Sequence, residues 1–277
     1  MALIGANDPP AVTMLHGARH SPFVLVIDHA GRAIPAALGD LGLSESDRAR
    51  HIAWDIGVAG VGAQLAGMLE ADMVTQNYSR LVIDCNRTPG HPTSIAPRSD
   101  TTEVPGNQAL AEADGAARVR EIFDPYHDRI ASLLDARLAA GQDTVLVALH
   151  SFTPRLASFG LAAEAAAGRP SAVTASGERP WHVGLLHNHD PCFALVLRDL
   201  LQAEGDLVVG DNEPYALSDI DDYTAPVHGE RRGLPHVEIE IRQDLIADEA
   251  GETLWAARLS RLLPLAWARY RADPGCP

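Results

Sequence analysis

A chain of 277 residues, of which 46% are apolar and 21% charged, can bury a large core and is expected to be globular rather than disordered. Its formal net charge is −15 and it contains no lysine, which argues against a surface for nucleic acid or an anionic membrane. The three cysteines, Cys85, Cys192 and Cys276, lack the spacing of a disulfide framework or a cysteine zinc site. We therefore expect a cytoplasmic protein in which any local cluster of arginines opposes the overall charge.

The N-terminal segment is expected to be a lead-in rather than a targeting signal. Residues 1–15 contain no basic residue and are interrupted by Asp8-Pro9-Pro10, which does not fit a signal peptide. No apolar run in the chain approaches the roughly 20 residues of a membrane span. We expect residues 1–20 to be a loosely held lead-in and residues 21–277 to form a single domain.

Strand and helix patterns alternate in the first half of the chain. Residues 23–28 are short, apolar and β-branched between a proline and a glycine, which is typical of a buried strand. Ser44-Glu-Ser-Asp47 resembles a capping box and predicts a helix that includes His51 and Asp55. The other predicted elements are a helix over 57–71 and strands over 72–76 and 81–84.

The second half continues this alternation around long loops. Residues 88–107 include four prolines and two glycines and can only form a loop, a feature that is often functional in compact domains. Residues 161–177 are rich in alanine, glycine and serine and predict a surface excursion, and residues 210–233 predict a polar loop. The remaining predictions are helices over 108–139, 192–202 and 249–270, and strands over 144–149, 183–186, 207–209 and 235–241.

This alternation predicts the fold class and the position of a site. Strands alternating with helices favour one α/β domain with a mostly parallel, mixed sheet flanked by helices. In open sheets of this kind, binding sites form beyond the carboxyl ends of the strands. His29, Asn86-Arg87 and His150 follow predicted strands, and Glu240 lies near the end of the last strand. We therefore expect these side chains to converge.

Two imidazoles at strand ends favour a metal site. Catalytic zinc usually takes three His, Asp or Glu ligands and leaves one position for water. His29 and His150 supply two ligands, and Asp55 is our candidate for the third. His51 is a rival, because a spacing of four places it on the same helix face as Asp55. Asp28 should point to the opposite side of its strand from His29 and is left out. The alternative is that His29 and His150 are structural histidines and that Asp55 is an acid on the surface of a helix.

Two acids on the last predicted strand suggest a catalytic base. Glu238 and Glu240 lie two residues apart and therefore face the same way, and buried acids need partners. We expect Glu240 to be a general base that activates water. A solvated edge strand with a cross-strand ion pair is the alternative interpretation.

Several arginines and polar residues fall near the same strand ends or in the loop before the last strand. Guanidinium groups bind carboxylates in a bidentate manner, so this set predicts a clamp for a small anionic substrate. A surface network of ion pairs would use the same residue types. His228 is assigned here as an oxyanion donor. The residues of the predicted clamp and pocket are Arg80, Arg87, Asn86, Arg231, Arg232, Asn212, Tyr215 and His228.

Other chemistries are disfavoured by spacing. Ser151 neighbours His150, but adjacent strand residues point apart, and the chain has no GxSxG elbow. The chain also lacks a Walker A sequence and GxGxxG, so nucleotide binding is not expected.

Six segments, in order, resemble the N-formylglutamate amidohydrolase family. Several of them are also similar to zinc carboxypeptidases, in which an Asn-Arg pair holds the substrate carboxylate, a late His-Ser carries a zinc ligand and a strand glutamate is the base. The matching segments span residues 28 to 245, nearly the whole chain. They are Asp28–Gly31, Trp54–Gly57, Ser79–Arg87, Leu149–Phe152, Gly210–Tyr215 and Arg232–Leu245.

The resemblance implies a zinc exopeptidase-like fold and assigns roles by position. One departure is Arg32, which stands where carboxypeptidases have a metal-binding glutamate three residues after the first histidine, so the carboxylate ligand must come from elsewhere. The implied roles are zinc binding for His29 and His150, carboxylate binding for Asn86 and Arg87, general base for Glu240 and carbonyl polarisation for Arg80.

The expected activity is that of a zinc-dependent amidase acting on an N-acylated acidic amino acid. N-formyl-L-glutamate is the preferred candidate, with formate and glutamate as products. A related metallohydrolase with another acyl-amino acid or a short peptide as substrate is one alternative. A carboxylate-binding module that no longer does chemistry is another. The fold class by itself does not select among these.

Overall fold

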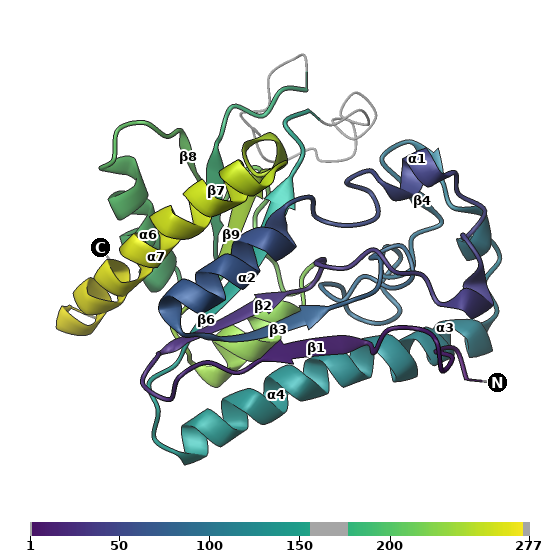
Figure 1. The fold of residues 1–277 in the computed structure, drawn as a ribbon, viewed down its shortest axis with the longest axis horizontal. Coiled ribbons are helices and arrows are strands. Elements are labelled where there is room, and N and C mark those ends of the chain that lie inside the picture. Colours follow the sequence, from purple (N-terminus) through teal and green to yellow (C-terminus); the bar gives the residue numbers. More distant parts are fainter. Residues whose placement is uncertain (1, 156–176, 274–277) are drawn as a thin grey trace.

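The computed structural model describes residues 2–155 and 177–273 and shows a central sheet with helices on both faces (Figure 1). The strands of this sheet are β1 (Val12–Leu15), β2 (Phe23–Ile27), β3 (Asp72–Gln76), β6 (Val145–Phe152), β7 (Val183–Leu186), β8 (Val209–Asp211) and β9 (His236–Arg242). They pair in the order β1-β3-β2-β6-β9-β7-β8. The central strands β3, β2, β6 and β9 are parallel, whereas β1 and β7 run antiparallel to β3 and β9. The predicted α/β domain with a mostly parallel, mixed sheet is confirmed.

Helices cover the two faces of the sheet unequally. On one face α2 and α6 pack against α7, and on the other α4 lies along β1 and β3 (Figure 1). A π-helical turn over Val119–Phe123 joins α3 to α4, so the helix predicted over 108–139 exists as one helical run that begins at Glu112. Among the described helices, none combines the length and the apolar character needed to span a bilayer. The helices are α1 (Glu45–Arg48), α2 (Val58–Leu69), α3 (Glu112–Arg118), α4 (Asp124–Ala139), α6 (Cys192–Gln202) and α7 (Glu249–Ala272).

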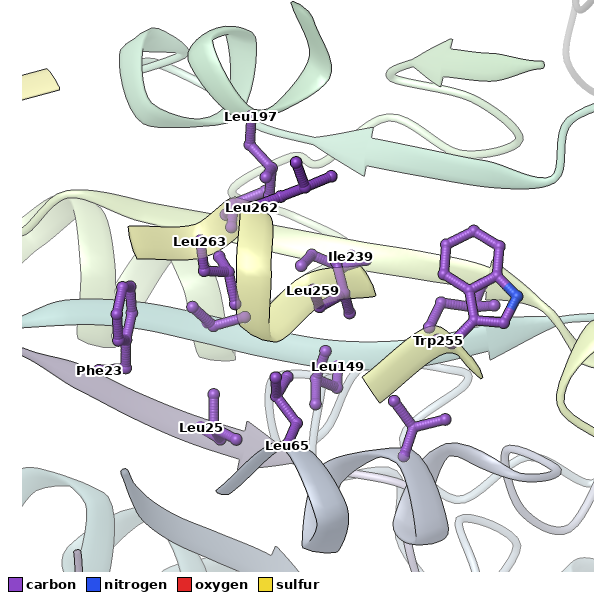
Figure 2. Packing of buried hydrophobic residues seen from close by; sticks show 14 of the residues in the cluster. Phe23, Leu25, Leu65, Leu149, Leu197, Ile239, Trp255, Leu259, Leu262 and Leu263 are labelled. Atoms are coloured by element: carbon purple, nitrogen blue, oxygen red, sulfur yellow. The ribbon is translucent and has the colours of Figure 1, made fainter. Parts of the chain in front are cut away.

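Alternation along the strands divides the core into two layers. In β2, Leu25 belongs to the cluster formed with α2 and α7, whereas Val26 belongs to the cluster on the α4 side. Figure 2 shows Leu65 of α2, Leu149 of β6 and Leu259 of α7 meeting in the first cluster. Full burial of each such side chain stabilises the fold by roughly 1.5–3 kcal/mol. Packing on both faces thus fixes the positions of the parallel strands, and with them the positions of the residues at their carboxyl ends.

Most predicted elements are found, but two local predictions are wrong. The strands expected over 72–76 and 183–186 coincide with β3 and β7. Residues 81–84 form a turn followed by irregular backbone instead of a strand, because their apolar side chains pack into the α4-side cluster without joining the sheet. The Ser44 hydroxyl does cap α1 by accepting a hydrogen bond from the N–H of Asp47, but α1 ends at Arg48 and does not carry the predicted metal ligands.

The expectation of a loosely held lead-in is also wrong. Residues 12–15 form β1, which pairs antiparallel with β3 over its whole length. Leu3 and Ala11 are buried, and the Glu121 carboxylate accepts a hydrogen bond of 2.7 Å from the backbone N–H of Leu3. The segment is short and only half buried, so its strand pattern is weak in the sequence. The surface excursion predicted over 161–177 lies, apart from its last residue, outside the described residues.

The predicted loop over 88–107 contains short elements of its own, among them a 3₁₀ turn at Pro105–Asn107. Strands β4 (Arg98–Ser99) and β5 (Thr102–Glu103) pair antiparallel within it. The polar loop predicted over 210–233 holds a π-helical turn at Ala225–Gly229 followed by a 3₁₀ turn at Glu230–Arg232. Residues 93–100 of the first loop and residues 215–222 of the second contribute to the cavities in which the site forms.

Candidate active site

The parallel strands bring the predicted residues to one edge of the sheet. His29 follows β2, while His150 and Glu240 lie near the ends of β6 and β9. The register of β6 and β9 pairs His150 with Glu240 and Ala148 with Glu238, so these positions are direct neighbours. Because Ala148 belongs to the α4-side cluster, alternation places His150 and both acids on that same face.

His29, Asp55 and His150 form a buried triad. Asp55 Oδ2 lies 3.4 Å from His29 Nδ1 and 3.1 Å from His150 Nδ1. All three side chains are only 2–3% exposed, and their donor atoms lie within 4.8 Å of one another. Two imidazole nitrogens and a carboxylate oxygen make a donor set that zinc and related divalent ions accept. The residues therefore fit a divalent cation.

Asp55 reaches this position from the turn that precedes α2. Its backbone N–H donates to the carbonyl of His29, and its carboxylate also accepts a hydrogen bond of 3.2 Å from the N–H of Ser151. The rival ligand His51 lies elsewhere, with its Nε2 3.2 Å from Asp100 Oδ2. These contacts favour Asp55 over His51 as the carboxylate of the triad.

A second carboxylate holds the outer nitrogen of each histidine. His29 Nε2 lies 2.8 Å from Asp84 Oδ1, and His150 Nε2 lies 3.1 Å from Asp28 Oδ2. Such carboxylate partners fix the tautomer and orientation of a metal-binding imidazole and turn the other nitrogen toward the ion. This chemistry of the outer contacts is an independent reason to regard the triad as a metal site.

The sequence analysis missed both of these carboxylates. Asp28 was left out because it should point away from His29, yet that face of the sheet is the one that carries His150. Asp84 was placed in a strand that does not form. The sequence Asp28-His29 at the end of β2 could have indicated that Asp28 belongs to the site. No local pattern, however, indicated that Asp28 contacts His150 across the sheet.

The buried carboxylates are ionised at neutral pH. Burial alone would raise the pKa of Asp28, but the hydrogen bond and charge of His150 lower it to about 2. The pKa values of Asp55 and Asp84 also fall below their usual range in spite of burial, the first mainly through the charge of His29 and the second mainly through that of Arg80. Burial opposes a charged His150, yet Glu238 and Asp28 hold its pKa well above the ordinary value. The site thus favours positive charge, which a cation would supply.

A cavity of about 350 Å³ opens at the triad. Burial raises the pKa of Glu240 to about 7 and that of Glu238 to about 8, and nearby carboxylates add to both effects. A carboxyl group with a pKa near neutrality can both accept and return a proton, as a general base requires. The predicted residues that line the cavity are His29, Arg80, Asn86, Arg87, His150, Tyr215 and Glu240.

Arg80 is fixed beside the triad. Its Nη2 donates to Asp84 Oδ2 at 2.7 Å, and its Nη1 donates to Asp55 Oδ1 at 3.4 Å. The guanidinium is therefore held by two of the carboxylates that surround the histidines. A cation held in this way can stabilise negative charge that develops in the cavity without first having to reorganise.

The Asn86-Arg87 pair already contacts carboxylates of the chain. Asn86 Nδ2 lies 3.4 Å from Glu238 Oε2, and Arg87 Nη1 donates to Asp222 Oδ1 at 2.9 Å. Burial raises the pKa of Asp222, while Arg87 opposes that shift. Glu238 and Asp222 are therefore part of the cavity wall, and the sequence analysis gave neither of them a role in the site.

Four predicted substrate-binding residues lie outside the described walls of this cavity: Asn212, His228, Arg231 and Arg232. Asn212 Oδ1 instead accepts a hydrogen bond from the backbone N–H of His187, and Arg232 donates to Asp135 on α4. The loop after β8 turns residues 215–222 toward the cavity, so the arginines that follow reach a different surface. Sequence order alone could not fix that direction.

Other chemistry considered from the sequence is not supported by contacts. Ser151 Oγ donates to the carbonyl of Ile56 at 2.9 Å, and no hydrogen bond to an imidazole is found for it among the described residues.

His150, Glu238 and Glu240 form another group with donor atoms close enough for a metal. However, His150 Nε2, which lies 3.8 Å from Glu238, is already bonded to Asp28. The triad with Asp55 is the better-supported site.

His228 is part of a buried histidine pair. It is 3% exposed, and its Nε2 lies 3.0 Å from His127 Nδ1. Burial lowers the pKa of His127 to about 4, and burial together with the charge of His127 lowers that of His228 to about 3. Both imidazoles are therefore neutral in the folded protein at neutral pH.

The buried pair of His127 and His228 should make the folded protein less stable in weak acid than at neutral pH. The unfolded chain binds a proton at a histidine near pH 6.5, whereas folded His127 binds one only near its pKa of about 4. Its contribution is complete above about pH 6.5 and is lost as the pH falls toward 4. For His127 alone, we expect about 2 kcal/mol of the free energy of unfolding to be lost between about pH 7.5 and pH 5.

Urea unfolding of the wild type and His127→Gln at both pH values measures this contribution. The exposed His20 provides the matched control, because His20→Gln also removes one imidazole but leaves the buried pair intact. Equal losses of stability in the wild type and His127→Gln would contradict the prediction.

Replacing Asp28 by asparagine should weaken the affinity for Zn²⁺ by about 10- to 100-fold. Asparagine keeps the size of the side chain, but it lacks the charge that orients the His150 imidazole. Competition with a chelating dye measures the Kd, with Asp47→Asn on the surface helix α1 as control. Equal affinities in the two variants would remove Asp28 from the metal site.

Comparison with known proteins agrees with the fold and identifies the family. The model of the N-formylglutamate amidohydrolase family matches residues 21–247. A gene product from Agrobacterium tumefaciens has a similar structure, with 34% sequence identity, a TM-score of 0.86 and coverage of 97% of this chain and 99% of that chain. An N-formylglutamate amidohydrolase from Ralstonia eutropha is 19% identical, with a TM-score of 0.66 and coverage of 95% and 100%, and this likeness shows the fold alone. Among curated proteins, none matches the chain.

The family match defines the class of protein: it is a hydrolase that acts on amide bonds. The family model covers far more than half of the chain. The chain belongs to the N-formylglutamate amidohydrolase family.

Proposed function

We propose that this enzyme uses zinc to remove the acyl group from an N-acylated acidic amino acid, with N-formyl-L-glutamate as the preferred substrate. The observation that carries the proposal is the buried triad of His29, Asp55 and His150, whose two histidines line the same cavity as Glu240. Membership in the family supports the formyl group and the glutamyl part of the substrate. The products would be formate and glutamate.

The triad is suited to hold the metal, and the surrounding residues are suited to support it. A divalent cation bound by His29, Asp55 and His150 would act as a Lewis acid toward the amide carbonyl and lower the pKa of water. Asp28 and Asp84 keep the two imidazoles oriented through their outer nitrogens.

Glu240 and Arg80 are suited to the proton transfer and the charge development. Glu240, with its pKa raised to about 7, takes a proton from the attacking water and returns it to the leaving nitrogen. Arg80, held by Asp55 and Asp84, stabilises the negative charge that develops on the carbonyl oxygen.

Arg87 and Asn86 are suited to bind the substrate next to the amide. Both hydrogen bonds found for the Arg87 side chain among the described residues use Nη1, and they go to Asp222 and the carbonyl of Asn86. The other nitrogens of the guanidinium can therefore donate one or two hydrogen bonds to a substrate carboxylate.

A panel of N-formyl-, N-acetyl- and N-succinyl-amino acids tests this proposal. With zinc present, we expect the highest kcat/KM for N-formyl-L-glutamate, because the cavity beside the triad is small and polar. Cleavage of another acyl-amino acid without turnover of N-formyl-L-glutamate would reject the preferred substrate and retain an amidase. Release of no acyl group from any of these compounds would reject the proposed function.

A further inference from the structure

A second cavity, of about 440 Å³, adjoins the first one. Arg80, Arg87 and Tyr215 line both cavities and therefore form a shared wall. The other side of the second cavity is formed by the turn after α1, which holds His51, and by the loop that contains Arg98 of β4. The second cavity therefore lies next to the first, on the other side of these three side chains.

The two cavities differ in charge. The described wall of the first contains two arginines and four acids, and that of the second contains three arginines and two acids. Both acids of the second cavity already have basic partners, since Asp84 accepts from Arg80 and Asp100 lies 3.2 Å from His51 Nε2. The described wall of the second cavity thus has one more arginine than acids, which favours the binding of a carboxylate there.

Arg98 is the arginine that the second cavity has and the first lacks. Its ion pair with Glu103 spans 3.5 Å, and the two side chains are 53% and 60% exposed. An exposed pair of this kind contributes little stability, so the guanidinium can turn to another carboxylate at small cost. In contrast, Arg87 is engaged by Asp222, and Arg80 by Asp84.

We propose that the second cavity is a subsite for the substrate carboxylate that is remote from the scissile amide, and that Arg98 determines specificity there. The inference rests on the proposed function, since it takes the amide to be cleaved beside the triad. A glutamyl side chain fits this arrangement, because its flexible carbon chain separates the terminal carboxylate from the amide nitrogen. The carboxylate next to the amide would remain with Arg87.

Selectivity between N-formyl-L-glutamate and N-formyl-L-glutamine tests the subsite, because the two compounds differ only in the charged group. We expect the wild type to favour the glutamate compound, and R98Q to reduce the ratio of the two kcat/KM values by roughly three- to tenfold. R261Q is the matched control: Arg261 is 57% exposed and pairs with Glu204 far along the chain from both cavities. An unchanged ratio in R98Q would overturn the inference.

A binding measurement separates this inference from the proposed function. Calorimetric titration of the purified protein with L-glutamate and L-glutamine requires no turnover, and we expect R98Q to weaken glutamate binding by a similar factor relative to glutamine. If this loss occurs but no N-formyl compound is cleaved, the subsite stands and the proposed function fails. If N-formyl-L-glutamate is cleaved with equal selectivity in the wild type and R98Q, the function stands and the subsite fails.

Discussion

Replacing Glu240 by glutamine should lower kcat by about 10²- to 10⁴-fold, the usual contribution of a general base. Glutamine keeps the size and hydrogen-bonding capacity of the side chain but cannot take the proton from water. Because Glu240 is not one of the three triad residues, the variant should still bind its metal. Steady-state release of formate, with metal content determined on the same sample, measures both expectations.

Glu238→Gln is the matched comparison for this prediction. Glu238 lies two residues away on β9, on the same face, and is also buried in the cavity wall, with its pKa raised to about 8. We expect the loss of kcat in Glu240→Gln to exceed that in Glu238→Gln by about tenfold or more. The reverse order would make Glu238 the base. Full activity in both variants would exclude a base on this strand.

Replacing Arg80 by glutamine should lower kcat by about 10²- to 10³-fold, the range found when one donor to a developing oxyanion is removed. Arg80 is held by Asp84 and Asp55 and lines the cavity beside the triad. Its charge should therefore matter most when negative charge appears on the carbonyl oxygen. Comparison of kcat and KM between the variant and the wild type measures this contribution.

Arg87→Gln separates this role from simple substrate binding. Arg87 lines the same cavity, but its assigned contact with a carboxylate is the same in the bound substrate and in the transition state. We therefore expect Arg87→Gln to raise KM more than it lowers kcat, and Arg80→Gln to do the opposite. A rise in KM alone for Arg80→Gln would contradict its assigned role.

The convergence of the triad was predictable because two histidines follow apolar strands that proved to be parallel. His29 and His150 lie at the same edge of the sheet for this reason. Asp55 was predicted as part of a helix that in fact ends at Arg48, and it reaches the site from a turn before α2. Residue type and position were therefore more informative here than the local secondary structure.

The remainder of the site depends on tertiary contacts that no local pattern encodes. Asp28 and Asp84 act on histidines from other segments of the chain, across 122 and 55 residues of sequence. Arg231 and Arg232 were assigned to the pocket because they precede β9, but their turn directs them elsewhere. The edge strand β1 was missed because it has only four residues and none of them is fully buried, so its strand pattern is weak in the sequence.

Metal content of the purified enzyme tests the central claim most directly. Elemental analysis should find one divalent cation per chain in the wild type, and a clear loss of it in Asp55→Asn, which removes a charged ligand from the triad. A chelator should abolish turnover, and added Zn²⁺ should restore it. Wild-type protein without a stoichiometric cation, with turnover that resists chelation, would contradict the account.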